Sequence, residues 1–164
     1  MTDEMLMEAA LEEAKLALQA GELPVGAVVA RDGEIIARGR NRREETHDPT
    51  AHAEIEAIRA AAAALGGWRL KGCALYVTLE PCAMCAGAIV AARLDKVVYG
   101  AADPAAGCCG SVYRVTEDPA FTHYAPAEGG LLADRCQALL TEFFEARRKG
   151  ENHGEPRGAH RRLD

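Results

Sequence analysis

The chain has 164 residues, a length typical of a single domain that can bury a hydrophobic core without disulfides or a structural metal. Its formal net charge of -6 argues against a protein that coats nucleic acid nonspecifically, because such proteins carry a broad basic surface. An acidic start at Asp3 and Glu4 predicts no secretory signal, and the most apolar window, residues 83–92, is too short to cross a bilayer. We therefore expect a soluble cytoplasmic protein without a membrane span.

The charge is distributed unevenly along the chain. Residues 147–164 contain 6 Lys and Arg against 3 Asp and Glu, whereas residues 1–146 contain 13 against 22. Any phosphate contact is therefore expected at the C-terminal end. From Gly150 onward Gly, Pro, His and Arg dominate, a composition typical of a disordered tail. We expect one ordered domain over residues 1–149 and a tail over residues 150–164.

The first part of the chain predicts a helix followed by a hairpin. Apolar residues recur at helical spacing over residues 7–18, between an N-cap candidate at Thr2 and a stop signal at Gly21. Two short apolar runs follow, at residues 24–30 and 35–38, and the Asp-Gly pair between them is typical of a hairpin turn.

The next part predicts a loop and a second helix. Residues 41–48 are polar and without periodicity, as loops are. The Asp-Pro pair at 48–49 predicts an N-cap and a first helical residue, with the helix running to about Leu65. His52 and Glu54 then lie near the start of the helix. They could not share a site in its interior, because residues two apart point to nearly opposite sides there.

A strand, helix, strand unit comes next. Residues 73–79 predict a buried strand, Pro81 opens a helix that ends near Arg93, and residues 96–100 predict a second strand. A unit of this length implies a parallel strand pair with a right-handed crossover, so the sheet is mixed. The loop over residues 101–110 follows the second strand, where open α/β sheets place ligand contacts.

The last part predicts irregular structure and then a helix. Pro119 and Pro126 bracket an irregular stretch with room for a short edge strand. A final helix is predicted by an apolar stripe at helical spacing, made by Leu132, Cys136, Leu139, Leu140 and Phe143.

Three candidate metal ligands stand out: His52, Cys82 and Cys85. A catalytic zinc typically keeps three protein ligands and leaves a fourth position for water. The two cysteines lie three apart, on one face of a first helical turn, where the positive helix end lowers thiol pKa values. Glu54 follows His52 by two residues, and a carboxylate beside metal-bound water suits general acid/base catalysis. The pattern predicts a catalytic zinc site in which Glu54 carries protons and is not a ligand.

The cysteines have two further interpretations. A C-x-x-C pair alone is also typical of a redox or structural site, but its combination with H-x-E favours catalytic zinc. Six cysteines could form three disulfides, yet in a reducing compartment such a set more often indicates metal binding or catalysis. The remaining four are interpreted as small buried residues: Cys73, Cys108, Cys109 and Cys136.

H-x-E followed by P-C-x-x-C is the signature of zinc-dependent nucleobase deaminases. The longer runs over residues 47–55 and 75–88 resemble the bacterial tRNA-specific adenosine deaminases, and the resemblance covers residues 5–148. It implies a cytidine deaminase-like fold, a three-layer α/β/α domain with a mixed, mainly five-stranded sheet. It also implies a homodimer with one zinc per chain, which hydrolytically deaminates adenosine to inosine at the wobble position of a tRNA anticodon. Glu54 would shuttle protons, and zinc-bound water would be the nucleophile.

The same resemblance implies a set of contacts with the anticodon stem-loop. Asn41 would bond the nucleoside, and Asp103 would contact a neighbouring nucleotide. The other implied substrate-binding residues are Ala53, Pro81, Phe144, Arg147 and Arg148. From the residues alone, the Phe143-Phe144 pair favours core packing over RNA stacking, and the role of His123 stays open. Thr122 departs from the family pattern, which usually has Asn before this histidine.

Two other functions remain as alternatives. The first is deamination of a free nucleobase or nucleoside, such as guanine, cytosine or cytidine, because the zinc chemistry is common to all of these enzymes. The second is a catalytically inactive, zinc-stabilised RNA-binding module, against which the presence of Glu54 argues.

Overall fold

The computed structural model describes residues 1–150, which form five strands and six helices. The strands are β1 (Gly26–Arg31), β2 (Glu34–Arg40), β3 (Cys73–Leu79), β4 (Lys96–Ala101) and β5 (Ala127–Glu128). The helices are α1 (Asp3–Gln19), α2 (Arg43–Thr46), α3 (Ala53–Leu65), α4 (Ala83–Ala92), the short 3-10 helix η1 (Val115–Glu117) and α5 (Ala133–Gly150). The tail expected over residues 150–164 lies outside the described residues, except for Gly150.

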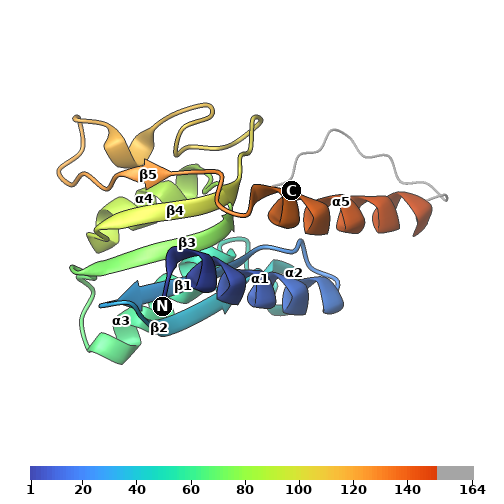
Figure 1. Cartoon of the computed structure of the whole chain (residues 1–164), viewed down its shortest axis with the longest axis horizontal. Coiled ribbons are helices and arrows are strands. Elements are labelled where there is room, and N and C mark those ends of the chain that lie inside the picture. The colour runs from blue at the N-terminus through green and yellow to red at the C-terminus, as the bar shows by residue number, and fades with distance from the viewer. Residues whose placement is uncertain (151–164) are drawn as a thin grey trace.

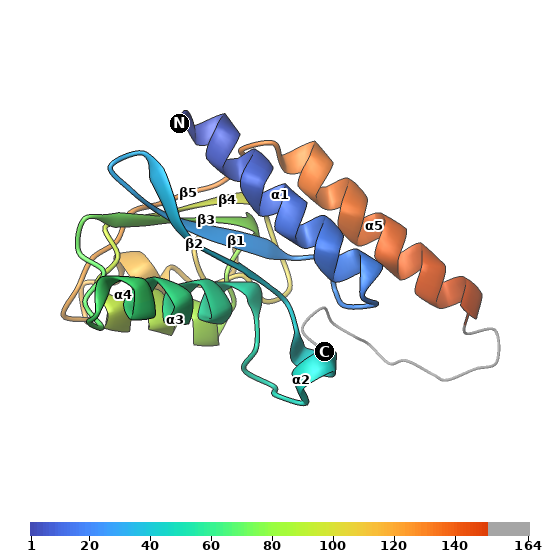
Figure 2. The same ribbon diagram turned by 90° about the horizontal axis from the view of Figure 1, so that it is seen from below.

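A mixed five-stranded sheet runs through the middle of the molecule in the order β2-β1-β3-β4-β5 (Figure 1). β1 pairs antiparallel with β2 and β3, whereas β3, β4 and β5 are parallel to one another. Helices α1 and α5 cover one face and α3 and α4 the other (Figure 2). The predicted three-layer α/β/α fold with a mixed sheet is confirmed.

Two glycines let helices lie directly on the hairpin strands. A Cβ at Gly26 would come within 2.1 Å of the Ala10 carbonyl oxygen of α1. A Cβ at Gly39 would come within 2.5 Å of the Ala53 carbonyl oxygen in the first turn of α3. Real Cβ atoms do not approach this closely, so neither position admits a side chain. The contact at Gly39 fixes the start of α3 against β2.

The local signals at the N-terminal end behave as predicted. The Thr2 hydroxyl caps α1 by accepting a hydrogen bond from the Met5 amide at 3.1 Å. Asp32 and Gly33 join β1 to β2 with φ values of 53° and 78°. Both residues are left-handed, as a two-residue hairpin turn that follows the strand twist requires.

The hydrophobic core lies around the central strands. β3 is buried over nearly its whole length, which agrees with the strand predicted for residues 73–79. Its fully buried Leu75 and Val77 belong to one cluster with Val28 and Val29 of β1 and Val97 of β4. Within residues 1–150, no helix combines the length and the apolar character needed to cross a membrane.

Three helix starts differ from the prediction, and one short helix was not predicted. α3 begins at Ala53 instead of 48–49, because the Asp48 carboxylate accepts bonds from the Thr50 amide and hydroxyl and closes a separate turn. α4 begins at Ala83, so Pro81 precedes the cap residue. The expected loop over residues 41–48 contains the four-residue helix α2. Leu132 lies outside α5, with a φ of 53°.

Candidate metal centre and active site

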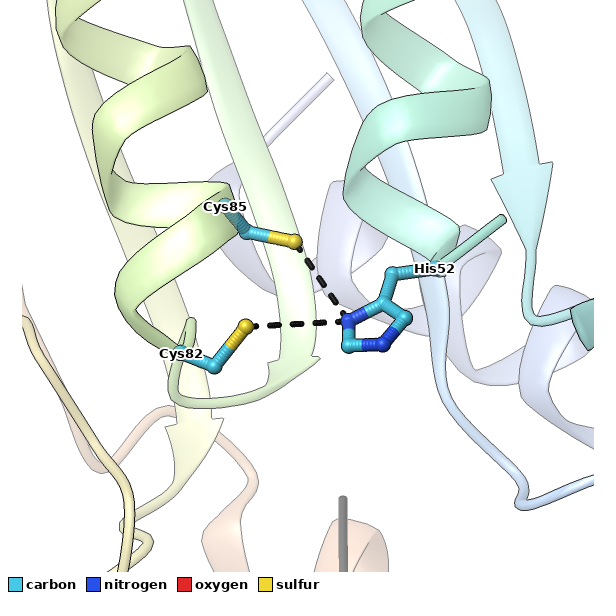
Figure 3. A group of neighbouring side chains, drawn as sticks. All are labelled: His52, Cys82 and Cys85. Carbon is cyan, nitrogen blue, oxygen red and sulfur yellow. Dashed lines mark hydrogen bonds between the residues drawn. The ribbon is translucent and has the colours of Figure 1, made fainter. Parts of the chain in front are cut away.

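The starts of α3 and α4 bring the three candidate ligands together (Figure 3). His52 is the N-cap residue of α3, Cys82 is the N-cap residue of α4, and Cys85 lies in the first turn of α4. The Sγ atoms of Cys82 and Cys85 lie 3.7 Å and 3.6 Å from His52 Nδ1. All three donor atoms lie within 4.8 Å of one another.

This donor set fits zinc in both distance and chemistry. With Zn–S near 2.3 Å and Zn–N near 2.0–2.1 Å, tetrahedral coordination separates sulfur from nitrogen by ~3.5 Å. The observed separations agree with that value to within a few tenths of an ångström. Two thiols and an imidazole also suit zinc better than they suit magnesium or calcium. The three residues could therefore hold one zinc ion with a fourth position free for water.

The two thiols have opposite pKa shifts. The Cys85 thiol donates to Cys82 and, together with His52, lowers the pKa of Cys82 to about 3. The neighbouring Cys82 sulfur, burial and then Glu54 raise the pKa of Cys85 well above its usual range. The Cys82 pKa is thus lowered by its neighbours Cys85 and His52. The lowering expected at a helix start does not occur at Cys85, which is completely buried beside an anion.

Glu54 lies beside the ligands without belonging to them. Its side chain is only 3% exposed and lies in the first turn of α3, two residues after His52. Its carboxylate interacts with the Cys85 thiol. Because His52 is the cap residue and not an interior residue of the helix, both side chains can reach the same pocket. This placement suits a group that transfers protons next to the metal site.

A pocket of about 270 Å³, including space open to solvent, adjoins the candidate ligands. Its lining comes from the residues just before β1, from the segment between β2 and the first turn of α2, and from the start of α3, namely Leu23, Val25, Asn41, Arg43, His52, Ala53 and Glu54. Asn41 is 5% exposed, and its amide nitrogen donates to the Leu23 carbonyl oxygen at 3.3 Å. The predicted residues Asn41, Ala53 and Glu54 therefore do meet at one pocket.

Comparison with known proteins assigns the family. Residues 1–101 match the model of the cytidine and deoxycytidylate deaminase zinc-binding region. The chain belongs to this deaminase family. It is therefore a zinc-dependent hydrolase, as the signature predicted.

The chain is similar over most of its length to tRNA-specific adenosine deaminases. It is 49% identical to that of Bacillus subtilis (strain 168) over 147 residues, which covers 90% of this chain and 91% of the relative. It is 44% identical to that of Aquifex aeolicus (strain VF5) over 145 residues, which covers 88% and 95%.

Solved structures of deaminases also match this chain. One from a study of A-to-I editing by tRNA deaminases at the wobble position matches with a TM-score of 0.80 and 47% identity, covering 83% of this chain and 99% of that one. A guanine deaminase from Nitrosomonas europaea matches with a TM-score of 0.75 and 28% identity, covering 85% and 83%.

Pro81 and Asp103, the two other residues expected in this part of the site, do not line this pocket. Pro81 is buried next to Cys82, and its carbonyl oxygen accepts a hydrogen bond from the Cys108 amide at 2.8 Å. Asp103 is 7% exposed and begins the loop after β4. Its carboxylate accepts bonds from the Ala105 and Ala106 amides, so it also closes a turn of that loop.

The residues expected in the terminal helix are not part of this pocket. The C-terminal part of α5 projects beyond the sheet (Figure 1). Phe143 is buried and contacts Phe144 edge to face, while Phe144 is 38% exposed. The Arg147 guanidinium lies over the Phe143 ring at 5.4 Å, and Arg148 is exposed. The core-packing interpretation is therefore right for Phe143 and wrong for Phe144.

The deaminase uses its other cysteines and His123 structurally. All six cysteines are free and buried. Burial raises the pKa of Cys109 to about 12 and that of Cys136 to about 11, which agrees with the prediction of inert buried residues. His123 Nε2 donates to the Leu94 carbonyl oxygen at 2.6 Å, just beyond the C-terminal end of α4. It therefore lies at the opposite end of that helix from the ligands.

Sequence reasoning missed three residues that shape the site. Arg43 lines the pocket, and its place in the polar run directly after Asn41 was the available signal. Glu22 is buried and accepts bonds from the Glu44 and Glu45 amides at the start of α2. Glu80 is completely buried beside Pro81. An acidic residue that directly follows an apolar strand was the signal for Glu80.

Proposed function

We propose that this deaminase converts adenosine to inosine at the wobble position of a tRNA anticodon. The main support is similarity to tRNA-specific adenosine deaminases over about nine tenths of the chain, at 49% identity for one relative. The site adds a pocket in which a proton-transfer carboxylate, an amide and apolar side chains lie next to a zinc-binding triad. A tRNA substrate also fits the cytoplasmic location expected from the sequence.

Different residues of the site have different roles in hydrolysis. Zinc held by His52, Cys82 and Cys85 would supply a Lewis acid that acidifies water. Glu54 takes one proton from the attacking water and passes it to the adenine ring. It then moves the second proton, from the hydroxyl formed by that water, to the departing amine. The water oxygen becomes the carbonyl oxygen of inosine, and the amine leaves as ammonia. Transfers of this kind contribute roughly 10²–10⁴-fold in rate.

The pocket walls would orient the base for this transfer. Leu23 and Val25 present apolar surface, which suits the face of a purine taken out of its stack. Asn41 is held by Leu23 on one side and by the Arg43 amide on the other, so its side chain enters the pocket wall in a fixed orientation. A nucleotide in an RNA loop suits such a pocket, because it is already splayed and costs little to extrude.

Deamination of free guanine is the second candidate. Its specific support is the structural match to guanine deaminases, including one from Bacillus subtilis at 36% identity with a TM-score of 0.61. Both functions use the same zinc site, so only a measurement of substrate preference distinguishes them.

The deciding experiment offers the zinc-loaded protein an anticodon stem-loop with adenosine at the wobble position, beside free guanine, cytosine and cytidine. Sequencing detects inosine as a base change, and ammonia release measures every substrate on one scale. We expect efficient turnover of the stem-loop alone. Efficient turnover of guanine with an untouched stem-loop would establish the second candidate. Binding of the stem-loop without ammonia release would indicate an inactive RNA-binding module.

We also propose that the protein is a homodimer through the outer surface of α3 and α4. α4 is apolar on all sides, and such a helix is normally buried. In the single chain, however, its Ala83, Gly87 and Ala91 are exposed. α3 lies beside it (Figure 2) and exposes Ala63 and Ala64 on its outer side. Small residues allow two helical layers to approach closely, and an isologous contact would pair this surface with itself.

Gly87 offers a clean test of the dimer. A Cβ at Gly87 meets no atom within 4 Å, so a larger side chain is accommodated in the single chain. We expect Gly87→Arg to shift the protein from dimer to monomer in analytical ultracentrifugation at micromolar concentration. The matched control is Ala138→Arg at an exposed position of α5, which should stay dimeric. A monomeric wild type would refute the proposal.

A further inference from the structure

Glu80 is the residue that joins the loop over residues 103–111 to the rest of the site. Its side chain is completely buried. Oε1 accepts bonds from the Asp103 amide at 2.9 Å and from the Ser111 hydroxyl. Oε2 accepts bonds from the Cys109 amide at 3.1 Å and from the Ser111 amide at 2.8 Å. The Glu80 carboxylate thus bonds to Asp103 at the start of the loop and to Cys109 and Ser111 at its end.

The loop fits closely around this carboxylate. A Cβ at Gly107 would lie 2.2 Å from the Glu80 carboxyl carbon, so the loop backbone passes directly over the group. The Cys108 amide donates to the Pro81 carbonyl oxygen at 2.8 Å, one residue before the ligand Cys82. The Glu80 amide itself donates to the Ala101 carbonyl oxygen at the end of β4. Glu80 therefore lies where the zinc-binding helix, the end of β4 and the loop meet.

We infer that Glu80 is a positioning residue for the substrate: it fixes the loop over residues 103–111, and with it Asp103, against the zinc-binding helix. The inference rests on the proposed function and on the contact between Asp103 and a neighbouring nucleotide that the family resemblance implies. Glu80 does not touch substrate itself, because it is enclosed by the loop. Its effect should appear in how well RNA is bound in a productive geometry, and not in proton transfer at the metal.

The hydrogen-bond pattern makes Glu80→Gln a selective probe. Three of the four contacts come from backbone amides, which only donate. A glutamine amide nitrogen in place of Oε2 would face two amides. In place of Oε1 it would face one amide and the Ser111 hydroxyl, which can turn and accept. Glutamine therefore adopts the second orientation and loses the bond to the Asp103 amide, while the Cys109 and Ser111 amides keep their acceptor.

The first experiment measures kcat and KM of zinc-loaded wild type and Glu80→Gln with the anticodon stem-loop. We expect KM to rise about 10-fold or more, as loss of a charge-assisted bond predicts, with kcat within about 3-fold and zinc content unchanged. Ser111→Ala is the matched control, since it removes one bond to Oε1 and leaves the Asp103 amide in place. Its KM should stay close to that of the wild type.

A double-mutant cycle shows whether Glu80 acts through Asp103. Asp103→Asn keeps the oxygen that accepts from the Ala105 and Ala106 amides but loses the charge. If the inference is right, Glu80→Gln raises KM much less in the Asp103→Asn background than in the wild type. Additive effects would overturn it, as would a loss of kcat, zinc or both at unchanged KM.

Amide hydrogen exchange of the zinc-loaded protein gives a test that measures the loop directly, without RNA. In the wild type, the Asp103, Cys109 and Ser111 amides should be protected although they lie in a loop. In Glu80→Gln, exchange at Asp103 should accelerate most. Rapid exchange of all three amides in the wild type would overturn the inference. Protection in a protein that does not deaminate RNA would instead refute the proposed function and leave the role of Glu80 in the loop intact.

Discussion

His52 and Cys82 are held by regular secondary structure, whereas the loops around them are held by two buried side chains. Each ligand caps a helix that packs in the layer beneath the sheet, and the close contact at Gly39 fixes the first turn of α3. The segment over residues 41–47, which contains α2, and the loop over residues 103–111 instead depend on the carboxylates of Glu22 and Glu80. The metal half of the site, made by the zinc ligands and Glu54, is therefore built into the fold. The proposed substrate half, made by these two segments, is attached to it by a few hydrogen bonds.

This difference explains how one fold can act on different bases. Guanine deaminases share the fold of this chain at 28% and 36% identity, so the layered fold tolerates extensive sequence change. We expect loops held by a few hydrogen bonds to be exchangeable without loss of the ligands. It follows that damage to the metal half should abolish turnover of every substrate. Damage to the loop half should change affinity for RNA and spare the chemistry.

The largest effect is expected from the ligands themselves. Cys85→Ser should release zinc and reduce ammonia release to the background level, because a hydroxyl ionises far less readily than a thiol and binds zinc poorly. Metal analysis and the ammonia assay measure the two losses together. Cys136→Ser is the matched control, a buried cysteine outside the site that should keep its zinc. Full zinc retention by Cys85→Ser would contradict the three-ligand site.

The second-largest effect is expected from Glu54→Gln. We expect a loss of roughly 10²–10⁴-fold in kcat on the stem-loop, because the amide keeps the shape of the side chain but cannot carry the proton. Zinc content should stay near one per chain, measured by metal analysis on the same sample. If zinc were lost together with activity, Glu54 would be a ligand or a support for one, and its role as a proton carrier would be wrong.

The sequence predicted the metal half of the site and the central strands, but it did not predict the side chains that hold the loops. The clustering of His52, Cys82 and Cys85, with Glu54 beside them, was predictable because zinc chemistry needs particular residue types at short spacings. The role of Glu54 in proton transfer stays a prediction. The central strands were predictable from their apolar runs, and β3 has the predicted bounds. The predicted start of α3 was wrong. The Asp48 carboxylate accepts local bonds from Thr50, and these outweighed a favourable N-cap and proline pattern.

The loop supports were missed for a physical reason. Glu22 and Glu80 accept bonds from amides 22 to 31 residues further along the chain, and no local pattern encodes such partners. An acidic residue is usually exposed, so without coordinates each one is interpreted as a surface residue. Phe144 shows the same limit, since helical spacing alone did not distinguish it from the buried Phe143.

Glu22→Gln should have a smaller effect than either change at the metal. The Glu44 and Glu45 amides bond to different oxygens of Glu22, at 3.0 Å and 2.7 Å, so a glutamine must lose one of them. We expect loosening of the wall that carries Asn41 and Arg43, and a rise of several-fold to about 10-fold in KM for the stem-loop. Steady-state kinetics and metal analysis should show little change in kcat or zinc. Glu44→Gln, at an exposed neighbour, controls for the loss of charge.

The smallest effect is expected from the basic end of α5, which is furthest from the chemistry. Arg147 and Arg148 are exposed on the projecting part of this helix, in a protein whose net charge is otherwise acidic. If they contact phosphates, Arg147→Gln with Arg148→Gln should weaken stem-loop binding only modestly at high salt. The double change should also reduce the slope of log K against log salt by roughly 0.7–0.9 per lost contact.

The control for this effect is Arg31→Gln with Lys71→Gln, which removes two exposed charges near the opposite end of the central strands. Binding of the stem-loop to all three proteins is measured by fluorescence anisotropy across a salt series. A reduced slope for the α5 variant alone would extend the substrate half of the site to the terminal helix. Equal slopes for both variants would confine it to the two loops that Glu22 and Glu80 hold, because general charge, and not contact, would then explain any weakening.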